Sequence, residues 1–399
     1  MPKKAGVSWV YSEVQLGEWT PTKAKSKNVG EVLRMPANVL ANASLSSDSL
    51  YPPALARQGL SAFMLRQTTL DVIDVVRQQA EKSVCDGVIA LDGPRGVGKS
   101  VTLLQTATHF AKEGWIVFYV PQPVQWVNGT EPFEPAAANS PTTTYAQPAV
   151  AARILDQLLK FNGRDRLAKI KVADSRSVAD VAQEGVSDPS RAQAALDDIV
   201  AALAADGKSR PRLLIAVDQI NTFYCTTAYH DTASQPITAD KLAAVRSFAS
   251  LFSLANKVPH AALLCAADKS DTQHRAPVLA ALLEAAKPVT TKTTSKSEPA
   301  IGRRYQDVSK VDEFGVLLPK ALAPASYDPL VSATDLHPKI AGTVAVPAYD
   351  LYEVASAAAY YSDCGVFSND VRIDRDFVEK ELVLTGGNAL KLHRRCLSL

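Results

Sequence analysis

The sequence predicts an α/β fold in which helices flank a parallel sheet. Two observations lead to this prediction. A glycine-rich octapeptide at residues 93–100 follows a short, apolar, β-branched run at 87–91 and precedes a run with helical spacing at 101–112. Two later apolar runs, at 115–120 and 212–219, have the length and composition of buried parallel strands. Strand, glycine loop and helix therefore occur in the order that a phosphate-binding loop requires.

The octapeptide reads Gly-Pro-Arg-Gly-Val-Gly-Lys-Ser and fits the pattern G-x-x-x-x-G-K-[ST] at every fixed position. Its three glycines allow a tight turn whose backbone N–H groups point into one concavity, at the positive end of the following helix. We expect Lys99 to reach the outer phosphates and Ser100 to ligate Mg²⁺. The alternative, a glycine-rich turn that binds nothing, is disfavoured because strand and helix both flank it. The predicted nucleotide contacts are Gly93, Pro94, Arg95, Gly96, Val97, Gly98, Lys99, Ser100 and Val101.

The composition describes a globular protein of 399 residues, with 47% hydrophobic residues, 21% charged residues and a net charge of +2. This length allows two or three modules. No apolar run approaches the roughly 20 residues that a membrane-spanning helix needs, so we expect no membrane span. The five cysteines are scattered without a C-x-x-C pair, which is typical of a reducing compartment.

Positive charge is uneven along the chain. It gathers near the N-terminus, in a middle segment and at the C-terminal end, at Lys3, Lys4, Lys23, Lys25, Lys27 and Arg34, then Lys287, Lys292, Lys296, Arg303, Arg304 and Lys310, then Lys391, Arg394 and Arg395. Two interpretations stay open: solvated faces, or contact with RNA phosphates. Residues 1–59 show little periodicity and are predicted to form an extended basic arm, disordered or laid along a partner.

Residues 60–300 are predicted to form the nucleotide-binding domain. A helix is expected to begin near Thr68 or Thr69 and to pack beside the first strand. An insertion at about 121–210 separates the second strand from the third. It begins with a surface excursion rich in Pro, Asn, Thr and Ala, and helical patterns follow at 148–160 and 191–205.

The third strand ends in Asp218, as in the Walker B pattern. At the carboxyl end of a strand adjacent to the loop, this Asp is predicted to hold Mg²⁺ together with Ser100. ATPases of the AAA+ type usually place Glu next, as the base that activates water, whereas this chain has Gln219. A side-chain amide cannot accept the proton, so the sequence predicts no catalytic residue here and slow hydrolysis or none. A water-positioning group from the loop that follows stays open, with the candidates Asn221, Tyr224, Tyr229, His230 and Asp231.

The rest of the chain is predicted to supply one more strand of the sheet and a helical end. A helix is expected from about 238 to 256, and a strand at 261–267 that ends in Asp268, either a polar sensor of the phosphate or an ordinary strand-end turn. Residues 301–399 are predicted to hold a linker, a final short strand at 346–349 and a lid of helices, whose expected ranges are 352–361, 374–384 and 388–397. Arg394 on the last helix is expected to approach a bound phosphate.

Taken together, these pieces resemble the family of the mitochondrial small-ribosomal-subunit GTP-binding protein, also known as death-associated protein 3. The resemblance covers roughly residues 60–399 and rests on the octapeptide at 93–100, Trp115-Ile116-Val117 ahead of Pro121 and Trp126-Val127, Ala216-Val217-Asp218-Gln219-Ile220-Asn221, Pro236-Ile237, and Tyr360-Tyr361. It implies an AAA+-like P-loop NTPase domain with a small C-terminal helical lid. It further implies a place in the head of the mitoribosomal small subunit, in the mitochondrial matrix, with contacts to rRNA, neighbouring proteins and an inter-subunit bridge. Its cofactor would be GTP or GDP with Mg²⁺, although no residue singled out above selects guanine over adenine.

Two functional hypotheses follow, with a third beside them. The first is a structural subunit of the mitoribosome that holds its nucleotide as a fixed cofactor. The second is an active AAA+/STAND-type NTPase switch, which needs a catalytic Glu and an arginine finger that the sequence does not reveal. The third is an apoptosis-linked signalling adaptor. Turnover that is lost in Lys99→Ala would favour the second, and co-sedimentation with mitochondrial small subunits supports the first alone.

Overall fold

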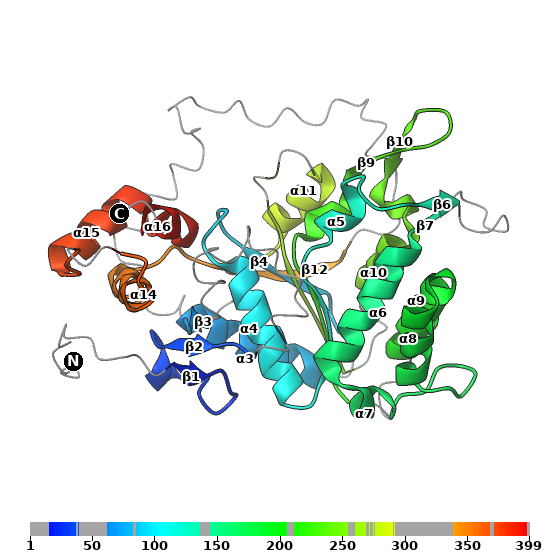
Figure 1. The fold of residues 1–399 in the computed structure, drawn as a ribbon, viewed down its shortest axis with the longest axis horizontal. Coiled ribbons are helices and arrows are strands. Elements are labelled where there is room, and N and C mark those ends of the chain that lie inside the picture. The colour runs from blue at the N-terminus through cyan, green and yellow to red at the C-terminus, as the bar shows by residue number, and fades with distance from the viewer. Residues whose placement is uncertain are drawn as a thin grey trace.

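The structure, a computed structural model, describes residues 16–36, 39, 62–82, 85–135, 144–205, 211–253, 260–268, 271, 274, 276–289, 291, 338–367 and 371–396. Its centre is a five-stranded sheet flanked by helices (Figure 1). The strands are β4 (Val88–Asp92), β5 (Ile116–Val120), β8 (Leu213–Val217), β11 (Ala261–Ala266) and β12 (Ile340–Ala345). Their order is β12-β4-β11-β8-β5, and every neighbouring pair is parallel. The predicted α/β fold with a parallel sheet is confirmed.

The strand order separates the two strands that lead to the predicted site. β8, which ends before Asp218, does not adjoin β4, which leads into the glycine loop, because β11 pairs with both and lies between them. The two sites still meet because parallel strands place all their carboxyl ends at one edge of the sheet. Helix α4 (Lys99–Lys112) packs across β11 and β8 from that edge, which brings its first turn toward Asp218.

The sheet separates two apolar layers, as the near-continuous hydrophobic strands predict. In β5, Val117 and Tyr119 face one layer, whereas Ile116, Phe118 and Val120 face the other. Helices α3 (Gln67–Glu81) and α4 belong to the first layer. The second layer holds α6 (Pro148–Asn162), α8 (Val178–Ser187), α9 (Pro189–Ala204) and α10 (Ala243–Ser253).

The insertion covers one edge of the sheet. The predicted helices at 148–160 and 191–205 are confirmed as α6 and α9, and α8 was missed. At the end of α6, Asn162 accepts a hydrogen bond from Val117 N (2.7 Å) and donates one to Val117 O (2.8 Å), which satisfies the open edge of β5. The smaller elements here are α5 (Val124–Val127), β6 (Glu134–Pro135), β7 (Tyr145–Ala146) and α7 (Arg164–Leu167).

Part of the predicted N-terminal arm is folded onto the body. Residues 16–36 supply β1 (Gly17–Glu18), the 3₁₀ turn Ser26–Asn28 and β2 (Val32–Arg34), and β2 pairs with β3 (Ala62–Met64). Trp19 is fully buried, so an extended arm is wrong for this stretch. A single buried Trp among polar residues produces no periodic pattern, so the packing of this segment could not be predicted from the sequence. Most of 1–59 otherwise lies outside the described residues, and the three domain boundaries stay predictions.

After β8 the chain makes a short excursion before the sheet resumes. It forms the 3₁₀ turn Ile220–Tyr224, the hairpin of β9 (Thr226–His230) and β10 (Pro236–Thr238), and a second 3₁₀ turn at Ala239–Lys241. The helix predicted at 238–256 therefore begins later, as α10. The predicted strand at 261–267 is confirmed as β11, and α11 (Pro277–Ala285) follows it.

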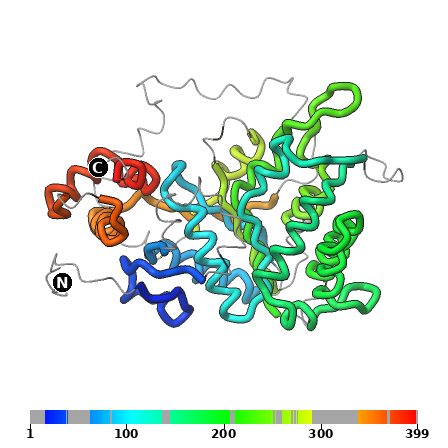
Figure 2. Tube along the Cα trace, in the orientation of Figure 1, coloured from blue at the N-terminus to red at the C-terminus, as the bar shows by residue number. Residues whose placement is uncertain are grey.

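The C-terminal part ends in the three predicted helices, α14 (Leu351–Asp363), α15 (Arg375–Thr385) and α16 (Ala389–Cys396). They share an apolar cluster of their own and gather at the end of the molecule opposite α8 and α9 (Figure 2). The strand predicted at 346–349 is wrong: β12 occupies 340–345, and the following residues lead into α14. The linker and the basic middle segment lie mostly outside the described residues. Among the described helices, none has the length and apolar character that a membrane crossing needs.

Candidate functional site

The glycine loop, residues 93–98, connects β4 to α4 at the carboxyl edge of the sheet. Gly93, Gly96 and Gly98 have φ of +150°, +85° and +105°, in the region where a side chain is strained. A Cβ on Gly93 would lie 2.6 Å from Val346 O, and one on Gly96 would lie 2.6 Å from Asn388 Oδ1. The glycines therefore have two roles. They permit the turn, and they leave room for the C-terminal segment to pack against the outer side of the loop.

The loop delivers the chain into the N-terminus of α4. Gly98 is the N-cap residue, and no side chain caps the helix. No acidic residue occupies the first turn. The first N–H groups of a helix lack partners within the helix, and together with the macrodipole they favour an anion.

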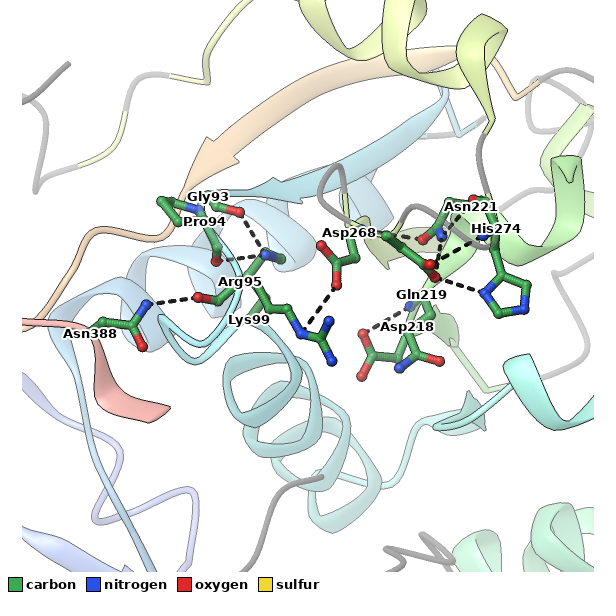
Figure 3. Close-up of polar contacts among 11 residues, drawn as sticks. Gly93, Pro94, Arg95, Lys99, Asp218, Gln219, Asn221, Asp268, His274 and Asn388 are labelled. Carbon is green, nitrogen blue, oxygen red and sulfur yellow. Dashed lines mark hydrogen bonds and ion pairs between the residues drawn. The ribbon is translucent and has the colours of Figure 1, made fainter. Parts of the chain in front are cut away.

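Lys99 lies in the first turn of α4 and is almost fully buried, at 8% exposure. Its Nζ donates to Gly93 O (2.6 Å) and Pro94 O (2.9 Å), so the ammonium group bends back over the glycine loop (Figure 3). Both contacts are with neutral carbonyls, which a phosphate oxygen can replace with a stronger, charge-assisted acceptor. Lys99 is therefore placed for the role that the sequence predicts.

Asp218 and Ser100, the two predicted metal ligands, are brought together. The Ser100 hydroxyl hydrogen-bonds to the Asp218 carboxylate, which also accepts from Gln219 N at 2.9 Å. The pKa of Asp218 is raised from its ordinary value of 3.8 to about 6, chiefly by burial and to a lesser extent by the charge of Asp268. The hydrogen bond from Ser100, that from Gln219 N, and the charge of Lys99 act in the opposite direction. A buried carboxylate beside a hydroxyl is an oxygen pair that suits Mg²⁺.

Gln219 adopts an unusual backbone conformation beside Asp218. Its φ and ψ are 47° and 44°, a left-handed conformation in a residue other than glycine. Its side-chain Oε1 is buried and, within the described part of the chain, accepts no hydrogen bond. Such strain concentrates at functional sites. The structure thus places an amide where the sequence comparison with AAA+ ATPases expects a carboxylate.

A polar group of residues lies beyond Gln219 at the same edge. Asn221 is buried; its Oδ1 accepts from Asp268 N (3.2 Å), and its Nδ2 donates to Asp271 Oδ2 (3.4 Å) and His274 O (3.2 Å). His274 Nδ1 lies 2.8 Å from Asp271 Oδ2 (Figure 3). Sequence reasoning singled out Asn221 and Asp268 but missed Asp271 and His274, which no motif marks. The network holds Asp268 in place at the end of β11.

The remaining predicted nucleotide contacts lie around this group of residues. Arg95 points from the loop toward Asp268, with 3.9 Å between Nε and Oδ2, and its side chain is 70% exposed. Val97 is buried beneath the loop, and Val101 continues α4. Arg394 is exposed and lies one turn beyond Leu390, whose N–H contacts the loop. Its approach to a phosphate stays a prediction.

Comparison with known proteins identifies the family. A family model described as mitochondrial ribosomal death-associated protein 3 matches residues 63–395. The chain belongs to this family. The match includes the whole sheet, the glycine loop and the three C-terminal helices, and it confirms the resemblance and the mitoribosomal setting that the sequence implied.

Three relatives of the family carry the name small ribosomal subunit protein mS29. The Neurospora crassa protein is 26% identical over 261 residues, which cover 59% of this chain and 52% of the relative. The Bos taurus protein is 26% identical over 168 residues, covering 39% and 42% of the two chains. For the Schizosaccharomyces pombe protein the identity is 25% over 119 residues, or 30% and 24%. The matched part of this chain thus spans about half the length of the Neurospora relative and less of the other two.

Proposed function

We propose that this chain is a structural constituent of the head of the mitoribosomal small subunit, and that it holds GTP or GDP with Mg²⁺ as a largely structural cofactor. Membership of the family and the names of the three relatives support the ribosomal part. Contacts with the rRNA, neighbouring mitoribosomal proteins and a bridge to the large subunit belong to the same proposal.

One observation carries the nucleotide part. Lys99 and Ser100 at the start of α4 meet Asp218 at the end of β8, although α4 and β8 are far apart along the chain. The residue after Asp218 is Gln219 rather than an acid. The loop and the first turn of α4 would hold the phosphates, and Lys99 would neutralise their charge. Ser100 and Asp218 would hold Mg²⁺, which when bound offsets the phosphate charge. The amide of Gln219 cannot take a proton from water, so the site favours holding the nucleotide over hydrolysing it.

The nucleotide part is tested by titrating the full chain with GTP, GDP and ATP in the presence of Mg²⁺ by calorimetry. We expect one site, tighter binding of guanine nucleotides, and loss of affinity when EDTA removes Mg²⁺. Lys99→Ala should abolish the heat of binding, whereas Lys112→Ala, on an exposed turn of the same helix, should not. Equal binding by wild type and Lys99→Ala would contradict the proposal.

An active NTPase switch is the second candidate, and Asp268 is the observation in its favour. Its carboxylate lies close enough to raise the pKa of Asp218, and Asn221 fixes its backbone. If Asp268 activates water, purified protein will release phosphate from GTP with steady turnover, and Asp268→Asn will abolish it while binding stays intact. Single-turnover or absent release favours the structural cofactor.

A further inference from the structure

Arg66 joins three parts of the molecule at the glycine loop. It occupies the N-cap position of α3, and its side chain is only 5% exposed. Its guanidinium binds both carboxylate oxygens of Glu353 in α14, at 2.8 and 2.9 Å. It also donates to Val97 O in the loop (3.1 Å) and to Pro347 O (2.9 Å) in the segment that leads to α14. A single buried cation thus contacts the body, the loop and the C-terminal helices.

The start of α16 contacts the same loop. Asn388 Nδ2 donates to Arg95 O (2.7 Å), and Leu390 N donates to Gly96 O (3.0 Å). Together with Arg66 on Val97 O, these donors occupy the carbonyls of three consecutive residues of the loop. Two of the three donors lie at the start of α16, and the third, Arg66, is tied to α14 through Glu353.

Holding those carbonyls fixes the N–H groups as well. In a planar trans peptide, the C=O of one residue and the N–H of the next point in opposite directions. Carbonyls of 95, 96 and 97 that are held toward the C-terminal helices therefore aim the N–H groups of 96, 97 and 98 the other way. A run of N–H groups that point to one side makes an anion-binding concavity.

We propose that Arg66 is a positioning residue that, with the first turn of α16, holds the loop in its anion-binding shape and couples nucleotide binding to docking of α14–α16. The inference rests on the proposed nucleotide site and adds its regulation. Because linkage is reciprocal, nucleotide stabilises the docked C-terminal helices by the same factor by which docking tightens the nucleotide.

The Arg66–Glu353 pair allows a sharp test because Glu353 has two roles that one substitution separates. Glu353 also completes the capping box of α14 with Asp350. Glu353→Gln keeps a residue that can complete the box but removes the charge. Arg66→Met removes the guanidinium while it keeps an unbranched apolar stem. Arg375→Met is the matched control, since its pair with Glu379 on α15 is exposed and distant from the loop in sequence and contacts.

The full chain and these variants are titrated with a fluorescent GTP analogue in the presence of Mg²⁺, and each Tm is measured without nucleotide. We expect Arg66→Met to weaken binding about 10-fold, within the usual range for coupled sites, and Glu353→Gln to act in the same direction. The double variant should be no weaker than Arg66→Met alone, because both changes remove the same contact. Arg375→Met should bind as the wild type does. Wild-type affinity in a folded Arg66→Met chain, with only Tm lowered, would overturn the proposal.

Hydrogen exchange on the unaltered chain gives a second readout that does not depend on a variant folding. Adding nucleotide should slow amide exchange throughout residues 351–396, well beyond the loop itself. If the wild type binds nucleotide but this exchange is unchanged, the coupling is overturned and the nucleotide site stands. If the wild type binds no nucleotide, both fall.

Discussion

The two sides of Asp218 differ in how fully the chain has built them. On the loop side, Lys99 donates to loop carbonyls, Ser100 hydrogen-bonds to Asp218, and further donors hold the carbonyls of residues 95–97. On the other side, Gln219 is strained and its Oε1 lies buried with no donor among the described residues. The proposed phosphate-holding side is thus fixed by these contacts, whereas the proposed water-activating side has an amide at the position where AAA+ ATPases place a base.

We infer from this difference that holding a nucleotide and hydrolysing it would depend on separate parts of the proposed site. Preorganised donors on the loop side need little rearrangement to bind phosphate, whereas hydrolysis requires a group that accepts a proton in reach of the water.

Lys99→Ala should break the phosphate-holding side outright. Removing a buried charge-assisted contact with phosphate should weaken nucleotide binding by about 10²-fold, or about 3 kcal/mol. The rise in Tm that saturating GTP gives the wild type should vanish, because bound ligand stabilises the native state by mass action. Thermal melts with and without nucleotide measure it, with Lys112→Ala as the control. A retained shift in Lys99→Ala would count against the account.

Gly96→Ala tests whether the loop is held from behind. Gly114→Ala is its matched control: the two glycines have φ of +85° and +91°, but a Cβ on Gly114 meets nothing, whereas one on Gly96 meets Asn388 and Leu390 within 2.7 Å. Both substitutions should lower the free energy of unfolding by roughly 1–2 kcal/mol, because alanine is strained in the left-handed conformation. Gly96→Ala should lower it by about 1–3 kcal/mol more, because its Cβ overpacks against Asn388 and Leu390. Urea unfolding measures both free energies. Equal losses of stability would mean that the start of α16 moves aside at no cost and does not hold the loop.

Gln219→Glu places a carboxylate where AAA+ ATPases have one and should raise the rate of GTP hydrolysis. We expect about a 10-fold gain in GTP hydrolysis, below the roughly 10²–10⁴ of a fully positioned base, because the new carboxylate stands beside Asp218. A phosphate-release assay measures the gain, and Lys99→Ala in the same chain should erase it. No gain would show that the site lacks a water as well as a base.

The raised pKa of Asp218 gives the smallest effect. Mg²⁺ must displace a proton from this carboxyl below about pH 6, so Mg²⁺-dependent binding should weaken about 4-fold between pH 7 and pH 5.5. Without Mg²⁺, the raised pKa of Asp218 affects stability in the opposite direction and favours the folded state at low pH. The folded carboxyl keeps its proton longer than the unfolded one, so its contribution to stability is full below pH 3.8 and is lost as pH rises to about 6. Asp218→Asn should flatten both profiles, and unchanged profiles would contradict this assignment.

Sequence alone predicted the parts of the molecule that local pattern controls. The strands β4, β5, β8 and β11 are uniform apolar runs, and the octapeptide at 93–100 has fixed spacing, so each could be predicted before folding. β12 could not, because it is a half-buried edge strand containing Gly342, and pairing with β4 decides its register.

Contacts between distant segments explain most of what sequence reasoning missed. Arg66 and Glu353 are 287 residues apart, and neither belongs to a motif. The strand order that places β11 between β4 and β8 is likewise a property of the whole sheet. The glycine loop could be located from its local pattern, and the contacts that hold the loop in shape could not.

The most direct test of the central claim, a nucleotide held without turnover, is to purify the protein within native mitochondrial small subunits, denature it and identify the released nucleotide by chromatography. We predict one guanine nucleotide per chain, bound tightly enough to survive purification and still largely triphosphate. Diphosphate that exchanges rapidly, adenine nucleotide with turnover, or an empty site would contradict it.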